Sequence, residues 1–364
     1  MSRATTVHLD LEALVHNLRR VRAAAPGRKV AAAVKAEAYG HGLVRIAQAL
    51  DADGFAVACL EEALILREAG LTQPILLLEG VFEAAELPLC VRHDLSIAVH
   101  HPEQLRMLEH ARLERPVQVW LKLDTGMHRL GLAPETASTI FQRLRESPAV
   151  APDIGWMSHL ARADERDCDY TLEQLQIFTA VTAGLPGERS LANSAGILGW
   201  PQTHFDWVRP GLMLYGVSPF VDSLAAAEDL RPVMTFHTRL TSINWLRKGE
   251  PVGYGGTWRC PEDMAVGVAA VGYGDGYPRH APSGTPVLLN GREASLIGRV
   301  SMDMITLDLR GHPEARIDDQ VTLWGNGLPI ERIAHAAETI AYPLLCGITA
   351  RVRREVISSD GFAT

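Results

Sequence analysis

Short apolar runs alternate with amphipathic helical stretches along residues 1–225 of this chain. The runs have the length of buried strands, and the stretches between them repeat apolar side chains at helical spacing. We predict strands at Val30–Lys35, Gly54–Ala58, Pro74–Glu79, Leu95–Val99, Val117–Asp124, Ile154–Ser158, Ser190–Asn193 and Trp207–Arg209. We predict helices within Leu9–Ala25, His41–Leu50, Leu60–Ala69, Pro102–Leu113, Pro134–Arg145 and Leu172–Ala183. This alternation indicates parallel βα units, which build either a (β/α)8 barrel or a doubly wound sheet.

Polar residues at the ends of these apolar runs favour the barrel. They follow nearly every predicted strand and are Lys35, Asp124, His159, Asn193 and Arg209. Barrel enzymes assemble their sites from residues at the carboxyl ends of several strands. We therefore predict an α/β fold with a (β/α)8 barrel and a functional site at that face.

The pattern changes after residue 225. Residues 226–364 carry β-rich runs with Gly and Pro turns at Thr235–Trp245, Met264–Tyr273, Thr285–Leu289, Glu293–Arg299, Met304–Leu307 and Asp319–Leu323. One short helix is expected near Ile330–Thr339. We predict a barrel domain over residues 1–225 and a mostly antiparallel β domain over residues 226–364.

Composition narrows the function. The 364 residues are 47% hydrophobic, as in a globular enzyme, and the net charge of −8 with scattered basic residues argues against nucleic acid. No apolar run is long enough to span a membrane, and Met1–Thr6 lacks the core of a secretory signal. The five cysteines, widely spaced and without C-x-x-C, are typical of free thiols in a reducing cytoplasm. No histidine pair has helix-face metal spacing with a third carboxylate ligand, so no metal is expected.

The most informative stretch is Val34-Lys35-Ala36-Glu37-Ala38-Tyr39-Gly40-His41-Gly42. Apolar surroundings disfavour the charged form of a lysine at the mouth of a buried strand. The same desolvation makes the amine nucleophilic, as a Schiff base to an aldehyde cofactor requires. The alternative is that Lys35 extends along apolar surface to reach solvent.

Three further segments carry candidate chemistry. In Leu121–Gly131, a strand runs into a glycine turn that presents Arg129, which suits capture of a carboxylate or a rim ion pair with Asp124. Loops after the last two barrel strands commonly hold a phosphate group. Ser194, Gly211 and Leu212 stand there, and Tyr39 can add its hydroxyl from the first loop.

In the second domain, tyrosines lie between glycines in Val252–Thr257 and Gly272–Tyr277, and a third run is Gly298–Met304. None has a nucleotide-loop pattern, so they read as bulges and hairpin turns.

Together these motifs closely resemble the alanine racemases over nearly the whole chain. The resemblance implies pyridoxal phosphate on Lys35, and L- and D-alanine as substrates. Arg209 would face the pyridine nitrogen; the alternative is a buried ion pair. Racemisation removes a proton from one face of the α-carbon and returns one to the other, so two groups can act without moving. The resemblance implies that Lys35 and Tyr254 are these groups.

The family pattern assigns the remaining residues. It makes His159 the partner of Tyr254 and Arg209 the partner of His159. It also implies that Arg129 binds substrate and that Lys122 is carbamylated and bonded to Arg129. The tyrosine comes from the other subunit, which implies a head-to-tail homodimer in which Met302 and Tyr273 line the partner's entrance and Asp303 supports them.

The sequence departs from the family pattern at three positions, and alternative functions have to be weighed. Glu37, Ser301 and Ala350 stand where asparagine, cysteine and tyrosine are common in the family. An amino-acid decarboxylase on the same barrel would need a carboxylate where Arg209 stands, and a non-catalytic pyridoxal phosphate protein would lack the second domain. A racemase of broader specificity is not excluded. D-Alanine supply for peptidoglycan and catabolism of alanine are both open as roles.

Overall fold

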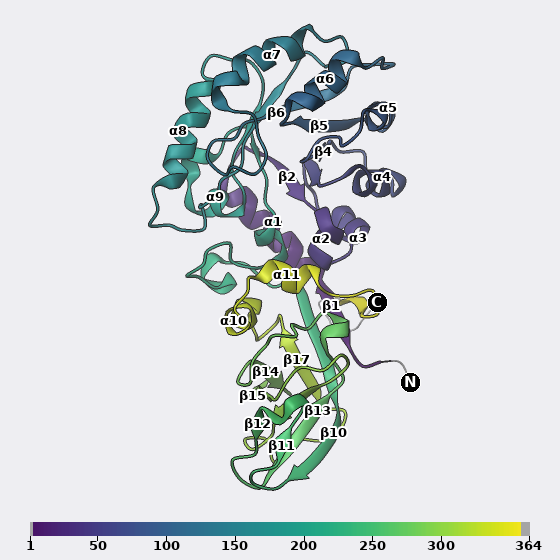
Figure 1. The fold of residues 1–364 in the computed structure, drawn as a ribbon, viewed down its shortest axis with the longest axis vertical. Coiled ribbons are helices and arrows are strands. Elements are labelled where there is room, and N and C mark those ends of the chain that lie inside the picture. The colour runs from purple at the N-terminus through teal and green to yellow at the C-terminus, as the bar shows by residue number, and fades with distance from the viewer. Residues whose placement is uncertain (1–2, 358–364) are drawn as a thin grey trace.

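The computed structural model describes residues 3–357, and eight of its strands close into a parallel barrel (Figure 1). The barrel strands are β2 (Lys29–Ala33), β3 (Gly54–Val57), β4 (Ile75–Leu77), β5 (Leu95–Val99), β6 (Gln118–Lys122), β7 (Gly155–Met157), β8 (Arg189–Ser190) and β9 (Trp207–Val208). Each overlaps one predicted strand, and β2 pairs with both β3 and β9, which closes the ring. The barrel prediction is therefore confirmed over the doubly wound alternative.

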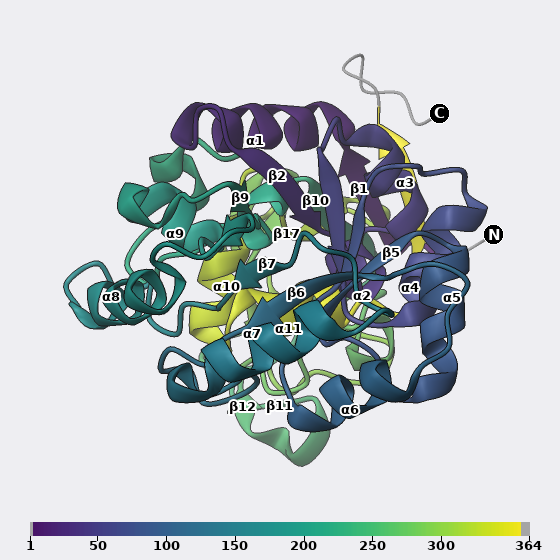
Figure 2. The ribbon, with the colours of Figure 1, turned by 90° about the horizontal axis from the view of Figure 1, so that it is seen from above.

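Helices surround the barrel strands in the view from above (Figure 2). They are α1 (Leu11–Ala24), α3 (Leu43–Ala49), α4 (Leu60–Glu68), α5 (Leu87–Arg92), α6 (Pro102–His110), α7 (Ala137–Glu146), α8 (Tyr170–Thr182) and α9 (Ser194–Gly199). The carboxylate of Asp10 caps α1 by accepting from the amide of Ala13 at 2.9 Å. Because the helices cover the outer face of the strands and the barrel interior covers the other, β3 is buried at every position and is apolar throughout.

The second unit is an eight-stranded sheet. Its strands, in sheet order, are β13 (Met264–Ala269), β16 (Ile305–Asp308), β15 (Arg292–Ile297), β14 (Pro286–Leu289), β17 (Gln320–Trp324), β10 (Met234–Leu246), β1 (Thr6–Asp10) and β18 (Arg353–Ile357). All pairs are antiparallel except β1 with β18. The short strands β11 (Pro251–Val252) and β12 (Trp258–Arg259) form a separate pair. The predicted β domain is therefore present.

Strand β1 lies in the second sheet although it begins the chain. It pairs with β10 and β18, so residues 6–10 belong by hydrogen bonding to the second sheet and not to the barrel. The local sequence of a short strand does not name its partner, and here the partners lie far along the chain. The boundary between residues 225 and 226 stays a prediction.

Two helices of the second unit face the barrel (Figure 1). Helix α10 (Ile330–Ala336) matches the predicted one, whereas α11 (Ala341–Cys346) is missing from the prediction because six residues are too few to show a helical period. Helix α11 lies against α2 (Lys35–Gly40), where a Cβ on Gly40 would come within 2.2 Å of the carbonyl oxygen of Leu345. Glycine thus permits the approach that brings α11 to the site.

Across residues 3–357, no helix combines the length and apolarity needed to cross a membrane. Nor does this part of the chain contain a group of three or more His, Cys, Asp or Glu residues that could hold a metal ion. The five cysteines are free thiols.

Candidate active site

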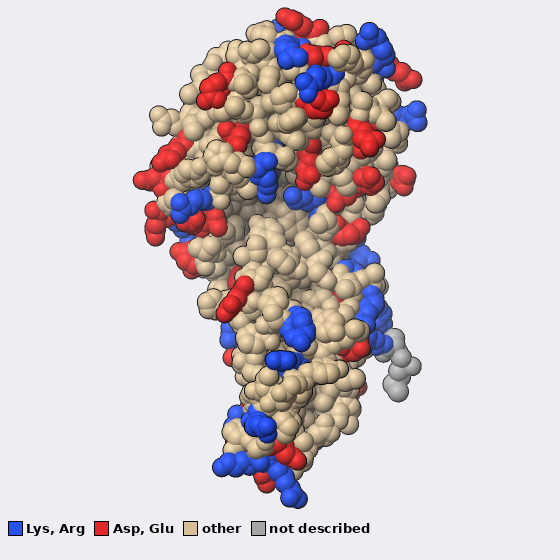
Figure 3. Space-filling view, in the orientation of Figure 1, with Lys and Arg blue, Asp and Glu red and all other residues tan. Residues whose placement is uncertain are grey.

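A cavity of about 1480 Å³ lies where the carboxyl ends of the barrel strands face α10 and α11. Figure 3 shows the surface hollowed at this level, between the two units. Most of the predicted site residues line it, namely Lys35, Tyr39, Lys122, Arg129, His159, Ser194, Arg209, Gly211 and Leu212. The fold therefore brings together residues from five segments of the sequence that the strand-end pattern had only placed at a common face.

Lys35 begins α2 and does not end a strand, because β2 stops at Ala33. The next four residues, Ala36–Tyr39, have φ between 51° and 55°, so they form a left-handed helical turn. This turn carries both Lys35 and Tyr39 to the cavity. Lys35 is half-buried, so the strong burial that the sequence predicted for it belongs instead to Lys122, which is 7% exposed.

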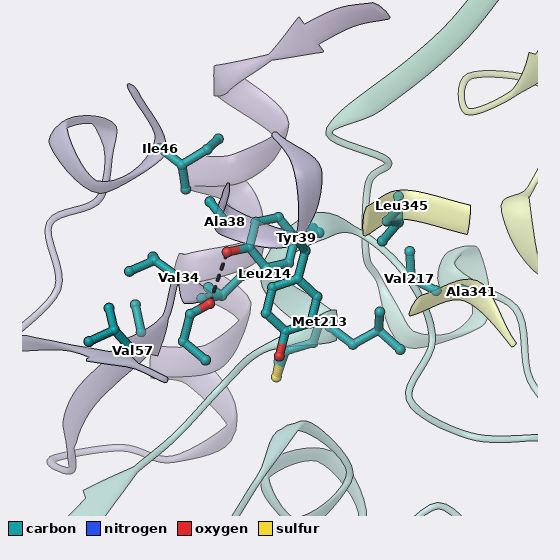
Figure 4. Packing of buried hydrophobic residues seen from close by; sticks show 14 of the residues in the cluster. Val34, Ala38, Tyr39, Ile46, Val57, Met213, Leu214, Val217, Ala341 and Leu345 are labelled. Atoms are coloured by element: carbon teal, nitrogen blue, oxygen red, sulfur yellow. Dashed lines mark hydrogen bonds between the residues drawn. The ribbon is translucent and has the colours of Figure 1, made fainter. Parts of the chain in front are cut away.

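Tyr39 is held by packing. Its ring stacks on that of Tyr215 at 4.7 Å between centroids, and its neighbours include Val34, Met213 and Leu345 of the apolar cluster in Figure 4. Burial raises the pKa of Tyr39, so its hydroxyl stays protonated and can donate a hydrogen bond into the cavity.

Arg209 is the most buried charge of the site, with 5% of its surface exposed. It donates to the hydroxyl of Ser190 at 2.5 Å and to the carbonyl of Ser158 at 2.6 Å, and it pairs with no carboxylate among residues 3–357. Burial lowers the pKa of Arg209 to about 10, which still leaves it cationic at neutral pH. The buried ion pair considered from the sequence is therefore absent, and the guanidinium is free to face a ligand.

His159 lies beside this cation. Its Nδ1 accepts from Arg209 Nη2 at 3.5 Å. Burial, followed by the charges of Arg209 and Arg129, lowers the pKa of His159 well below its usual value. The imidazole is thus neutral, and because Nδ1 accepts, its proton resides on Nε2, which is left as a donor.

Lys122 and Arg129 also line the cavity. Burial lowers the pKa of Lys122 to about 8, and the nearby Arg209 and Arg129 act in the same direction. Arg129 is exposed to the cavity and forms no ion pair within the described chain, because Asp124 instead accepts from His128 Nδ1 at 3.0 Å. Arg129 is thereby left available for an anionic ligand.

A polar cradle lies after β8 and β9. The hydroxyl of Ser194 accepts from the amides of Gly211 at 2.9 Å and Met213 at 3.3 Å. A Cβ on Gly211 would lie 2.5 Å from the hydroxyl of Tyr39, so only glycine leaves room there. The amides of Gly211 and Met213 are thus already bonded to Ser194, and the donors left for an anionic oxygen group are the hydroxyls of Ser194 and Tyr39.

The remaining predicted residues do not join the cavity of their own chain. Tyr254, Met302, Tyr273 and Asp303 lie in turns of the second unit. Tyr254 is 68% exposed and Met302 is 53% exposed, and none of the four lines the cavity.

Several cavity residues escape the sequence prediction, and three of them are polar side chains beside the predicted ones. Tyr342 and Cys346 come from α11, and no local pattern assigns that short helix to the barrel. Glu79 also lines the cavity and ends the predicted strand Pro74–Glu79, so the strand-end signal that selected the other residues was sufficient to find it.

The three positions at which the sequence departs from the family pattern, Glu37, Ser301 and Ala350, do not line the cavity. Glu37 is exposed, and its carboxylate accepts from the amide of Leu43 at the start of α3 at 3.2 Å. Ala350 is exposed, and the carbonyl of Ser301 accepts from the amide of Tyr273 at 3.1 Å.

Comparison with known proteins supports the resemblance seen in the sequence, and the matches cover most of the chain. The family model described as alanine racemase, N-terminal domain, matches residues 9–219, and that of the C-terminal domain matches residues 233–356. An alanine racemase of Nitrosococcus oceani is 56% identical over 348 residues, covering 95% of this chain and 97% of that relative. The biosynthetic alanine racemase of Escherichia coli K12 is 52% identical, covering 97% and 99%. The biosynthetic alanine racemase of Pseudomonas aeruginosa has a solved structure with a TM-score of 0.96 and 46% identity, covering 98% and 100%.

Proposed function

Because the chain belongs to the alanine racemase family, we propose that Lys35 and the partner subunit's Tyr254 exchange protons with opposite faces of the substrate α-carbon. The protein is an isomerase that interconverts L- and D-alanine and depends on pyridoxal phosphate. The single observation that carries the proposed assignment is the cavity that gathers Lys35, Arg129 and Arg209 at one end of the barrel.

The residues present fit pyridoxal phosphate. Lys35 supplies the amine that an aldehyde group requires, and the cradle of Tyr39, Ser194, Gly211 and Leu212 would hold the phosphate. The narrow space beside Gly211, which a Cβ would fill, agrees with a closely bound phosphate group. When bound, the cofactor withdraws electrons from the substrate α-carbon and so makes its proton removable.

In this proposal, Arg209 determines how strongly the cofactor withdraws electrons from the substrate α-carbon. It is a buried cation without a carboxylate partner, and a guanidinium cannot accept a proton at neutral pH. Arg209 facing the pyridine nitrogen would therefore leave that nitrogen unprotonated. A weaker electron sink favours return of the proton to the α-carbon over side reactions.

His159 and Arg129 complete the roles in the proposal. The Nε2 proton of neutral His159 would donate to the phenol oxygen of Tyr254 and stabilise its deprotonated form. Arg129 would bind the carboxylate of alanine in bidentate fashion. The neutral fraction of Lys122 is the form that reacts with carbon dioxide, forming an N–C bond and releasing a proton, and the resulting carbamate would pair with Arg129.

The proposal includes a head-to-tail homodimer. Tyr254, Met302 and Tyr273 are exposed and lie outside the cavity of their own chain, which suits residues that complete a partner's site. Asp303 would support this entrance. We also infer a cytoplasmic enzyme that supplies D-alanine for peptidoglycan; the free thiols and the relatives named biosynthetic support this inference.

Two variants test the assignment. Lys35→Ala is expected to abolish the visible absorption of bound pyridoxal phosphate and racemisation, whereas Lys29→Ala, a surface lysine paired with Glu188, serves as the control. Tyr254→Phe is expected to keep the absorption and lose racemisation in both directions. Persistence of the visible band in Lys35→Ala would refute the cofactor assignment.

Mixing these two inactive proteins tests the shared site. After dissociation and random reassociation, a mixed dimer holds one site with an intact Lys35 and an intact Tyr254 only if the tyrosine acts across subunits. Activity should then return to about a quarter of the parent level, since half of the dimers are mixed and half of their sites are intact. No recovery would place both residues in one chain and overturn the proposed arrangement.

A further inference from the structure

The turn that carries Lys35 and Tyr39 is held in an unfavourable backbone conformation. Ala36, Glu37, Ala38 and Tyr39 have φ values of 52°, 55°, 51° and 54°. In residues with a side chain, the left-handed region is disfavoured because Cβ approaches the following carbonyl oxygen. Such a turn persists only where its surroundings impose it.

One side chain hydrogen-bonds the backbone carbonyls of this turn. The Nδ1 atom of His41 lies 2.8 Å from the carbonyl oxygen of Tyr39 and 3.0 Å from that of Ala38. Both partners are acceptors, so Nδ1 must carry the proton and donate to both. No other donor reaches the carbonyl of Tyr39 among residues 3–357.

His41 is itself rigidly placed. It is fully buried, and its ring packs on Tyr215 with 4.6 Å between centroids. The ring of Tyr215 also stacks on that of Tyr39, with 4.7 Å between centroids. The glycines on either side of His41 have φ of 80° and 100°, which lets the chain fold the imidazole back over the turn that precedes it.

We propose that His41 is a positioning residue for the cofactor site: its Nδ1–H holds the left-handed turn through the carbonyls of Ala38 and Tyr39. The turn in turn sets the directions in which Lys35 and Tyr39 enter the cavity. This inference rests on the proposed roles of those two residues. His41 itself does not line the cavity and touches no reacting atom.

Other contacts on the turn do not substitute for this one. Glu62 accepts from the amide of Ala36 at 2.7 Å, and Arg354 donates to the carbonyl of Gly40 at 2.8 Å. These contacts hold the two ends of the turn. His41 is the residue whose side chain donates to the carbonyls of Ala38 and Tyr39, the last two residues of the turn. Tyr39 is also the residue whose hydroxyl lies beside Gly211.

Three variants at this position separate the donor from the bulk of the ring. His41→Leu keeps apolar volume and removes the donor. His41→Asn keeps an N–H where Nδ1 stands, and His41→Gln moves the N–H one methylene further away. The affinity of the cofactor-free protein for pyridoxal phosphate is measured by absorbance titration, beside the thermal midpoint of the same cofactor-free protein. His312→Leu is the control, because it removes a buried histidine bond to the carbonyl of Glu293, outside the cavity.

We expect His41→Leu to weaken cofactor binding by about 5- to 100-fold, the range for loss of one buried hydrogen bond, and His41→Asn to restore it to within about 3-fold. His312→Leu should lower the thermal midpoint and leave cofactor affinity at the parent level. Parent-like affinity in His41→Leu would overturn the proposal, as would equal losses in the leucine and asparagine variants.

If His41→Leu does not fold, the comparison of asparagine with glutamine decides, and equal affinities there would also overturn it. These outcomes are distinct from failure of the proposed function, which persistence of the visible band in Lys35→Ala would reveal.

Discussion

The left-handed turn after Lys35 leads to a prediction of unusual sign. Ala36 is exposed and sits at φ 52° and ψ 56°, where an alanine costs about 1–2 kcal/mol relative to glycine. Ala36→Gly removes this penalty, while the greater freedom of the unfolded chain subtracts about 0.4–1 kcal/mol. The difference spans about 0 to 1.6 kcal/mol, so the substitution is expected to stabilise the folded protein by about 0.8 kcal/mol.

The matched control is Ala180→Gly. Ala180 is also exposed, but it lies in the right-handed helix α8, where glycine destabilises by about 0.5–1 kcal/mol. Thermal midpoints of the two cofactor-free variants, at one fixed protein concentration, should therefore move in opposite directions. If Ala36→Gly lowers the midpoint as much as Ala180→Gly does, the strain attributed to the turn is wrong.

Three further predictions concern the buried charged residues Lys122 and Asp275 and the polar cradle at Gly211. Lys122→Met should stabilise the cofactor-free protein at pH 7 by on the order of 3 kcal/mol. At this pH, which is below the folded-state pKa of about 8, Lys122 is protonated, so the folded protein must bury its charge. The gain should fade between pH 8 and 10.5, where the unfolded chain still binds the proton, as urea unfolding in buffer free of carbon dioxide would show. Gly211→Ala should weaken pyridoxal phosphate binding about 10-fold or more in an absorbance titration, since its Cβ would lie 2.5 Å from the Tyr39 hydroxyl. Asp275→Ala should destabilise by about 3 kcal/mol in the same unfolding assay, because this fully buried carboxylate holds two arginines, whereas Glu314→Ala, at an exposed partner of Arg292, should change stability by less than about 0.5 kcal/mol.

Much of the cavity lining could be predicted from the sequence. Barrel strands are buried on both faces, so each reads as a short apolar run, and the first polar residue after it marks the functional face. This signal selects Lys35, Asp124, His159, Asn193 and Arg209, and all of them except Asp124 line the cavity. It works because strand ends in a closed parallel barrel meet at one rim whatever the loops between them do.

Where local pattern misled, the cause was a distant partner or a local backbone choice. The run that ends near Lys35 looks like a strand up to the lysine, yet the chain leaves β2 at Ala33 and turns left-handed. Alanine and tyrosine have no intrinsic preference for that turn. The imidazole of His41 and the close passage of α11 at Gly40 impose it.

The amino-acid order alone determined that a barrel precedes a β domain and predicted most of the polar side chains that line the cavity, because periodicity and strand-end residues are local properties. The tertiary structure decided that β1 joins the second sheet, that α11 closes the cavity, and that Lys122 is the deeply buried lysine. It also left Tyr254 exposed, outside the cavity of its own chain. Burial and pairing depend on residues far apart in the chain, and no local pattern contains that information.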